Sequence, residues 1–442
     1  MKDIPLIKKS KNLLSLIAVN LALTFVCVES LSLAFYFINH KMFFYTRSKT
    51  QEQVITELER TGVRLDESIV ERLHPFFGYV LKQGAFTKEE LGLKVNSQGF
   101  FSLYDYPFVK QKENQFIIGF FGGSVSNNFV NDEYVTKRFS EKLKKFPEFA
   151  NQEIIVLNFA NGGYKQPQQL LILNYFLALG QKFDMVVNID GFNEVALSNL
   201  NNKSQVDLGM PSVQHIQPLT GLANNSLSLE VMSSIVKISE TKKQLKETIN
   251  KLENCQLALC YSLTSLRLKR LAGEYQQEII IYDRNVKQSN ATDGKNNIVY
   301  IPKAKSILDD GKAFEKMAAT WYESSLMMRQ LLAKRKISYF HFIQPNQYYP
   351  TKRVFTEEEK RLYVISDSPY SSAIKRGYPL LLSKAEDLRK LNMNIFSAVN
   401  ILDNTKETVY KDACCHYNEI GDELLANYIS SSIIQELRKS KK

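Results

Sequence analysis

Four places along the chain carry side chains or glycines that together could perform acyl transfer. Ser124 follows the apolar run "QFIIGFFGG", and Gly163 lies in "NFANGGY". Asn193 lies in "DGFNE", and Asp412 and His416 lie in "DACCH" near the C-terminus. In acyl transfer a histidine removes the proton of a serine hydroxyl, a carboxylate holds the histidine tautomer, and N–H donors stabilise the tetrahedral oxyanion. Each residue alone is typical of a turn or a helix cap, but their order along the chain favours a serine nucleophile.

The elements that must position these residues alternate between strands and helices. Short apolar runs begin at Gln115, Glu153 and Asp184, and 165–181 has the apolar period of a helix. Apolar runs that alternate with helices predict a parallel sheet covered on both faces, which is a three-layer α/β/α sandwich. Sites in such sheets lie at the carboxyl ends of the strands, where the candidate residues are found.

The alternation is interrupted by a long helical insertion at about 195–335. Residues 227–277 carry an apolar stripe at i, i+3, i+4 spacing, and a second helix is expected at 313–334. The strand pattern then resumes at 337–345. We expect a helical hairpin or cap on the α/β domain; a coiled-coil surface for a protein partner is the alternative use of the stripe.

The candidate residues resemble the signature of the SGNH hydrolases, also called GDSL lipases and esterases, and in particular their membrane-anchored, exported bacterial members. That family has its serine in a G-D-S block, an oxyanion glycine after the second strand, its asparagine in G-x-N-D, and D-x-x-H near the C-terminus. The resemblance implies that Ser124 is the nucleophile, His416 the base and Asp412 its partner. It also implies that Gly163 and Asn193 form the oxyanion hole with the Ser124 amide, and that no metal or organic cofactor is needed. It covers residues from Phe116 to the C-terminus apart from the insertion.

Three positions depart from the family pattern. Gly123 stands where the family has an aspartate, and Glu194 replaces a second aspartate, which keeps the charge but lengthens the arm. Three residues separate Asp412 from His416 where the family has two. A bulge or a helical turn could absorb the extra residue, because a helical turn brings positions i and i+4 to one side. Otherwise Asp403 or a backbone carbonyl could orient the ring, leaving a Ser–His dyad.

The N-terminus predicts one transmembrane anchor. Residues 13–38 are almost wholly apolar, and at about 1.5 Å per residue they exceed the roughly 30 Å hydrocarbon layer. The run is longer than the apolar part of a cleavable signal peptide, and no small-x-small cleavage site follows it. Lysines before it favour a cytoplasmic N-terminus at 1–12 and an extracytoplasmic catalytic domain. We expect a membrane-proximal stalk and lead-in at 39–114, a hydrolase domain at 115–442, and a Glu29 that is protonated or paired with a helix.

Net charge and cysteine content limit the possible binding partners, disulfide pairings and metal sites. The net charge of +11 comes from scattered basic residues mixed with acids, which argues against nucleic-acid binding and favours an anionic lipid or acidic polymer surface. Four cysteines outside the predicted span, Cys255, Cys260, Cys414 and Cys415, allow three pairings. Neither pair has C-x-x-C spacing, so we expect no metal site. A bridge between the two pairs would clamp the insertion to the loop of the proposed base; a local Cys255–Cys260 bridge fits the sequence equally.

These observations lead to an expectation of a single-pass membrane esterase with a Ser124 acyl-enzyme and no cofactor. The expected substrate is an O-acyl or O-acetyl group on a cell-envelope or secreted glycan, or else a lipid ester, and this choice rests on location and family resemblance. An O-acyltransferase with the same serine is the nearest alternative, since it differs only in whether water or a sugar hydroxyl intercepts the acyl-enzyme. A non-catalytic envelope assembly or binding protein, with the insertion as its partner surface, is the alternative from another class.

Overall fold

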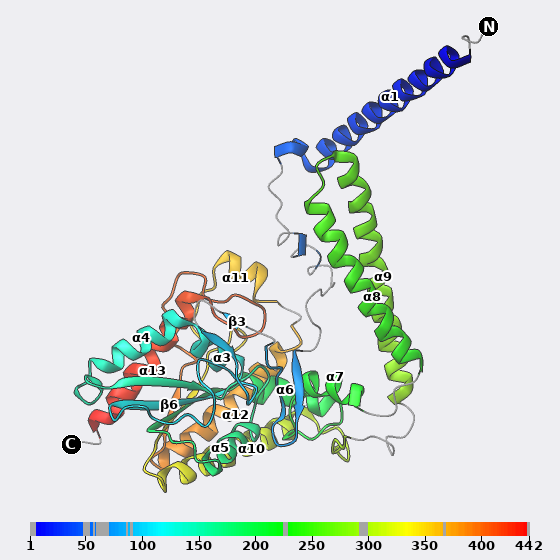
Figure 1. The fold of residues 1–442 in the computed structure, drawn as a ribbon. Helices are drawn as coiled ribbons and strands as arrows, with labels where there is room; N and C mark the ends of the chain where they lie inside the picture. The colour runs from blue at the N-terminus through cyan, green and yellow to red at the C-terminus, as the bar shows by residue number, and fades with distance from the viewer. Residues whose placement is uncertain are drawn as a thin grey trace. The chain divides into compact units, whose positions relative to one another are not determined.

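The computed structural model describes residues 6–46, 54–55, 58, 70–84, 87–88, 92–223, 229–290, 299–365 and 368–439. The chain forms two compact units (Figure 1). One, the helical unit, consists of Met1–Ser68 and Asn224–Ile298; the other, the sheet unit, consists of Ile69–Ala223 and Val299–Lys442. Every candidate catalytic residue lies in the sheet unit.

The sheet unit is built on a five-stranded parallel sheet with the strand order β10-β9-β8-β6-β7. The strands are β6 (Gln115–Gly122), β7 (Glu153–Asn158), β8 (Met185–Asp190), β9 (Ser338–Ile343) and β10 (Asn394–Ser397). All of β8 and nearly all of β6 and β9 is buried, which explains why these strands read as continuous apolar runs in the sequence. The strand order reverses at β6, because β7 lies on one side of it and β8 on the other. Such a reversal is where parallel sheets place their ligands.

Helices cover both faces of this sheet, so the predicted three-layer α/β/α sandwich is confirmed. Helix α4 packs against α13, and α10 packs against α5, α6 and α12. Figure 1 shows these two groups on opposite sides of β6. The helices of the sheet unit are α3 (Ser124–Asn131), α4 (Glu133–Lys144), α5 (Gln168–Ala178), α6 (Phe192–Lys203), α7 (Val213–Ala223), α10 (Asp310–Ala333), α11 (Glu357–Leu362), α12 (Ser371–Lys390) and α13 (Glu419–Lys439).

The lead-in to the first large strand belongs to the sheet unit. It contains the hairpin of β1 (Glu71–His74) and β2 (Gly78–Leu81), and a small antiparallel sheet of β3 (Thr87–Lys88), β4 (Leu93–Val95) and β5 (Phe101–Ser102). Its aromatic side chains, among them Phe77, Tyr79 and Phe100, are buried in the main core. The aromatic-rich lead-in therefore packs on the core of the sheet unit through these rings.

The helical unit contains α1 (Leu6–His40), the 3-10 turn η1 (Phe44–Thr46), and the helices α8 (Leu229–Glu253) and α9 (Ala258–Asn290). Helices α8 and α9 pack along one another as a hairpin, and α1 packs on α9. The predicted insertion is therefore divided, because its central hairpin lies in the helical unit while α7 and α10 lie in the sheet unit. Among the described residues, Leu16–Asn39 of α1 is long and apolar enough to cross a membrane.

Candidate active site

Ser124 is the first residue of α3, directly after the carboxyl end of β6. The two glycines before it are required by close packing. A Cβ at Gly122, which has φ +143°, would lie 2.0 Å from the carbonyl oxygen of Ile189. A Cβ at Gly123 would lie 2.1 Å from Nδ2 of Asn193. The glycines thus let the turn from strand to helix approach β8 and α6, and Ser124 is held in a tightly packed corner of the sheet.

Ser124, His416 and Asp412 form a continuous chain of hydrogen bonds. The hydroxyl oxygen of Ser124 lies 2.7 Å from Nε2 of His416, and Nδ1 of the same ring is hydrogen-bonded to Oδ2 of Asp412. The serine comes from the end of β6, and the other two residues come from the loop before α13. Residues 288 or more positions apart are thereby placed in the order that a serine nucleophile requires.

The three-residue spacing in "DACCH" is accommodated by the aspartate itself. Oδ1 of Asp412 accepts hydrogen bonds from the amides of Cys414 at 2.8 Å, Cys415 at 3.0 Å and His416 at 3.3 Å. The side chain therefore caps the loop with one oxygen and holds the imidazole with the other. Asp412, and not Asp403, is the carboxylate hydrogen-bonded to the His416 ring.

The environment of Asp412 keeps its carboxyl group ionised. Burial raises the pKa of Asp412, but the hydrogen bond and charge of His416 and the amides of Cys414 and Cys415 lower it more, so the pKa is about 2. A carboxylate that is charged at every ordinary pH stabilises a positive charge on the adjacent ring. The Asp412 carboxylate therefore helps His416 to accept a proton.

Three consecutive side chains after β9 hold this loop from its other side. Asn346 donates to the carbonyl of Cys414 at 3.0 Å, Gln347 to that of Asp412 at 3.1 Å, and Tyr348 to that of Ala413 at 2.8 Å. Sequence analysis did not assign these residues a role. Their signal was present, since a polar run directly after a buried strand lies at the carboxyl edge of the sheet.

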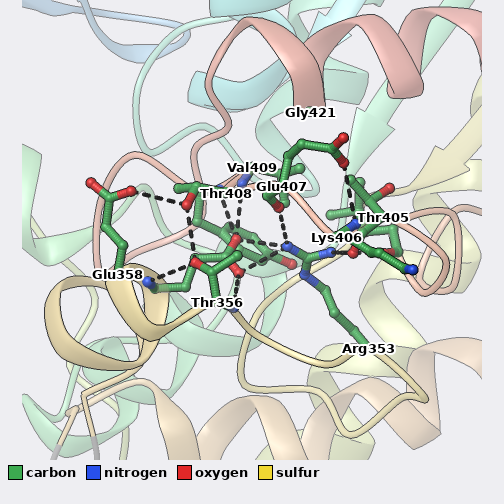
Figure 2. A network of polar contacts seen from close by, with 12 residues as sticks. Arg353, Thr356, Glu358, Thr405, Lys406, Glu407, Thr408, Val409 and Gly421 are labelled. Atoms are coloured by element: carbon green, nitrogen blue, oxygen red, sulfur yellow. Dashed lines mark hydrogen bonds and ion pairs between the residues drawn. The ribbon is translucent and has the colours of Figure 1, made fainter.

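A buried ion pair fixes the segment that leads into the loop. Arg353 donates to both carboxylate oxygens of Glu359 at 2.8 Å, and both side chains are almost fully buried. The same guanidinium donates to the carbonyls of residues 402, 405 and 407, and Glu359 accepts from the amide of Val409 at 2.9 Å. Figure 2 shows Arg353 surrounded by this segment, with Thr356 at the start of α11 beside it. The network orders the backbone just ahead of Asp412.

We expect Glu359→Gln to destabilise the fold, because it leaves the Arg353 charge buried without its partner. Removing one member of a buried ion pair costs about 3–5 kcal/mol of unfolding free energy. Although burial raises the pKa of Glu359, its hydrogen bonds and Arg353 lower it more, so the net shift is downward. This contribution is present above the unfolded pKa of about 4.3 and is lost as the pH falls through the lower folded value. Chemical denaturation at pH 7 and at acid pH measures it.

The matched control is Glu357→Gln on the same helix, because Glu357 is exposed and pairs only with exposed Lys360 among the described residues. An exposed pair of this kind contributes little, about 0–1 kcal/mol. An equal loss of stability in the two variants would show that the Arg353–Glu359 pair does not hold the loop.

Asn193 lies beside the serine as the second residue of α6, after the end of β8. One N–H of its Nδ2 is donated to the carbonyl of Tyr164 at 2.8 Å, and the same nitrogen packs against Gly123. The adjacent Gly163 has φ +73°, which favours glycine. The structure thus brings Asn193 and the loop of Gly163 together next to the N-terminus of α3.

Glu194 ties the same turn to the loop after β7. Its carboxyl oxygens accept from the amides of Gly191 at 2.8 Å and Gln166 at 3.1 Å. Burial and the neighbouring Asp190 raise the pKa of Glu194 to about 8, against the effect of the amides. Enclosure in the core thus opposes the negative charge on Glu194, and the amide donors around its two oxygens favour it.

A second histidine–carboxylate pair lies next to Gly163. Nδ1 of His215, on α7, lies 2.8 Å from Oε1 of Glu71 on β1, and the ring stacks on Tyr79 with centroids 4.9 Å apart. A Cβ at Gly163 would lie 2.3 Å from Nε2 of His215, so this edge of the ring faces the glycine. Sequence analysis assigned no role to His215, because nothing in the spacing of two residues 144 positions apart points to the pair.

The remaining buried histidine has a structural role. His341 is fully buried on β9, where its ring nitrogens contact Asp190 at 2.8 Å and Ser325 at 2.9 Å. Trp321 donates to the same carboxylate at 3.0 Å. The pair is enclosed in the core, so it joins α10 to the sheet and does not reach substrate.

The cysteines form a local bridge. Cys255 and Cys260 are joined by a disulfide at the turn between α8 and α9, and Cys414 and Cys415 are free. The alternative in which a bridge clamps the insertion to the loop of His416 is wrong, because the first two cysteines face one another across their own turn.

Cys414, Cys415 and His416 lie close enough together to hold a metal ion by distance alone. Both ring nitrogens of His416 are already used, one by Ser124 and one by Asp412. A metal ion could bind this histidine only by displacing one of them, so the arrangement fits a proton acceptor better than a metal ligand.

No protein-family model matches the sequence, and no curated protein sequence matches it. Several solved structures align with the chain at low scores, among them two lipases. The lipase Lip_vut3 from a goat rumen metagenome is 10% identical, with 72% of this chain and 97% of the lipase covered and a TM-score of 0.33. A lipase/acylhydrolase from Enterococcus faecalis is 12% identical, with 73% and 96% covered and a TM-score of 0.33.

Proposed function

We propose that this protein is a serine esterase that forms an acyl-enzyme on Ser124. The observation that carries the proposal is the hydrogen-bond chain from Ser124 through His416 to the ionised Asp412 at the carboxyl edge of a parallel sheet. In this mechanism Nε2 of His416 takes the hydroxyl proton as the serine oxygen attacks the ester carbonyl. Asp412 holds the proton on Nδ1 and stabilises the imidazolium that forms.

The oxyanion of the tetrahedral intermediate needs N–H donors, and we propose three for this role. They are the Ser124 amide at the start of α3, the Gly163 amide, and the Nδ2 of Asn193, which has a second N–H besides the one donated to Tyr164. Collapse of the intermediate expels the alcohol, which takes the proton from His416. A water molecule, activated by the same ring, then hydrolyses the acyl-enzyme and restores the serine.

We further propose that α1 stays attached as a membrane anchor, with residues 1–12 in the cytoplasm and the sheet unit outside. The apolar stretch Leu16–Asn39 meets the length of a span, and its side chains are almost all exposed. Glu29 and Tyr36 of the same helix are buried against the α8–α9 hairpin. Loss of α1 as a cleaved signal peptide would remove contacts on which the helical unit is built, which favours a retained helix.

For the substrate we propose an acyl ester of a hydroxyl-rich molecule, such as an acetylated glycan. The support is the polar pair of His215 and Glu71 beside Gly163, where the ring edge carrying Nε2 faces the loop of the proposed oxyanion hole. A half-buried imidazole held by a carboxylate is suited to hydrogen-bond a hydroxyl of the acyl carrier. A site for a plain lipid ester has no need of such a group.

We expect His215→Gln to raise KM for an O-acetylated oligosaccharide by about tenfold. The variant loses one hydrogen bond to the substrate, which contributes about 1 kcal/mol or slightly more to binding. KM for p-nitrophenyl acetate should change little, because that ester has no hydroxyl to bind. Glu71→Gln should reproduce the effect by releasing the ring. Equal changes in KM for both esters would contradict a role in recognising the alcohol.

Product analysis tests the reaction itself. Full-length protein in detergent is incubated with an O-acetylated polysaccharide, with and without an unacetylated acceptor oligosaccharide. We expect free acetate in both cases, and none from the Ser124→Ala variant. Acetyl groups found on the acceptor would support the acyltransferase alternative. If neither free acetate nor acetylated acceptor formed, and Ser124 did not react with a fluorophosphonate, the result would favour a non-catalytic assembly or binding protein.

A further inference from the structure

The turn of the α8–α9 hairpin has an unusual composition for a protein surface. Residues 254–266 read "NCQLALCYSLTSL" and contain no charged side chain. Charged residues flank this stretch on both sides, with Lys251 and Glu253 on α8 and Arg267 and Lys269 on α9. We call residues 254–266 the hairpin tip.

The hairpin tip is bound to α1 through a carboxylate in the apolar span. Oε1 and Oε2 of Glu29 accept hydrogen bonds from the amides of Ala258 at 2.6 Å and Leu259 at 2.9 Å, the first two residues of α9. These amides have no partner within their own helix, and the positive end of a helix dipole favours a carboxylate. The expected pairing of Glu29 with a helix is therefore seen, and its partner is the start of α9.

Aromatic packing and a disulfide reinforce this contact. Tyr261 of the hairpin tip packs edge-on against Tyr36 and Phe44, with ring centroids 5.2 Å and 5.8 Å away. Cys255 and Cys260 bridge the turn, and Cys255 is buried with these rings in one cluster. The disulfide thus closes the hairpin tip, and the tip packs on the C-terminal half of α1.

The other side of the hairpin tip carries exposed leucines. Leu257, Leu263 and Leu266 are 38%, 59% and 62% exposed. The neighbouring part of the helical unit is similar, since Leu31 of α1 and Phe43 just after it are each 70% exposed. Exposed apolar side chains on an uncharged turn beside an apolar span are typical of a surface that contacts a membrane or another protein.

The position of Glu29 gives the depth of the hairpin tip. It lies ten residues before Asn39, the outer end of the apolar stretch, which corresponds to about 15 Å along the helix. A charged carboxylate at that depth of the bilayer costs free energy unless it has a partner, and the α9 amides are the partners of Glu29. A tip that reaches Glu29 therefore has to pass below the surface of the bilayer.

We propose that the α8–α9 hairpin tip is inserted in the lipid bilayer beside α1, and that its partner is the acyl-chain region of the outer half of the membrane. The proposal rests on the anchor part of the proposed function and is independent of the esterase chemistry. Insertion gives the protein a second membrane contact beside α1. The helical unit is then held in the membrane by the hairpin tip as well as by α1.

Quenching by brominated lipids tests the proposal. Three variants of the full-length protein, Leu263→Trp, Ile280→Trp and Leu21→Trp, are reconstituted in phosphatidylcholine vesicles with or without bromine on the acyl chains. Leu263 and Ile280 are both on α9 with 59% and 60% exposure, and they lie about 25 Å apart along the helix. Trp321 is fully buried in the sheet unit, so the wild type provides the background emission.

We expect loss of emission in brominated vesicles for Leu263→Trp and Leu21→Trp, and none beyond background for Ile280→Trp. Quenching of Leu21→Trp without Leu263→Trp would overturn the inserted tip while leaving the anchor in place. Absence of quenching in Leu21→Trp would overturn the anchor itself, and the inserted tip with it. Equal quenching of Leu263→Trp and Ile280→Trp would overturn a contact confined to the tip.

Discussion

Replacing Ser124 with alanine is expected to reduce kcat/KM for ester hydrolysis by about 10⁴-fold or more. The hydroxyl oxygen is the atom 2.7 Å from Nε2 of His416, and no other side chain in the described part of the chain is hydrogen-bonded to that nitrogen. Losing the nucleophile of a serine hydrolase removes nearly all of its rate enhancement. Initial rates with p-nitrophenyl acetate and with longer-chain esters measure the effect.

Ser126→Ala is the matched control for this variant. Ser126 lies on the same helix, is fully buried, and its hydroxyl has no hydrogen-bond partner among the described residues. We expect it to keep most of the wild-type rate. If Ser124→Ala retained turnover equal to that of Ser126→Ala, the serine would be a turn residue and not a nucleophile.

Replacing Asp412 with asparagine is expected to lower kcat by about 10⁴-fold while leaving the fold intact. The amide oxygen of asparagine can still accept from the backbone amides of the "DACCH" loop, so the loop keeps its cap. The amide NH₂ would then face Nδ1 of His416, which forces the opposite tautomer and removes the proton acceptor at Nε2. Thermal unfolding distinguishes this chemical loss from a loss of structure.

Asp403→Asn is the control for this prediction, since Asp403 was the other carboxylate that the sequence offered as a partner of the ring. It is expected to behave as wild type. A large loss of rate in Asp403→Asn, with Asp412→Asn nearly unaffected, would contradict the assignment of the acid.

The pH profile gives a second test of Asp412. Its pKa of about 2 lies below the usual value for aspartate, so the carboxylate remains charged from neutral pH down to strongly acid conditions. Its contribution to folding is present above the unfolded pKa of about 3.9 and is lost only as the pH falls through the folded value. The carboxyl group of Asp412 should therefore contribute nothing to the pH dependence of kcat/KM near neutral pH.

The positions that sequence analysis placed well are those fixed by the sheet. Ser124 and Asn193 follow neighbouring parallel strands, and the carboxyl ends of such strands meet at one edge whatever the length of chain between them. The alternation of buried strands with helices was enough to predict this edge. The insertion did not disturb the prediction, because β9 resumes the sheet beside β8.

Other features depend on side-chain packing that no local pattern contains. Glu71 and His215 come from two peripheral elements and meet only in the folded unit. Arg353 is similar, because its partners are backbone carbonyls and a buried carboxylate that composition does not reveal. The extra residue in "DACCH" was ambiguous in the sequence, since several loop shapes fit it, and the capping of the loop by Asp412 is a property of the folded backbone.

The most direct test of the central claim is covalent labelling of the full-length protein in detergent with a fluorophosphonate, followed by peptide mass spectrometry. A serine hydroxyl activated by the His416–Asp412 pair should give a single adduct on Ser124 that forms rapidly in the wild type and is absent from Ser124→Ala. Labelling in Asp412→Asn should be far slower. An adduct on another serine, or none on folded wild-type protein, would contradict the assignment of Ser124 as an activated nucleophile.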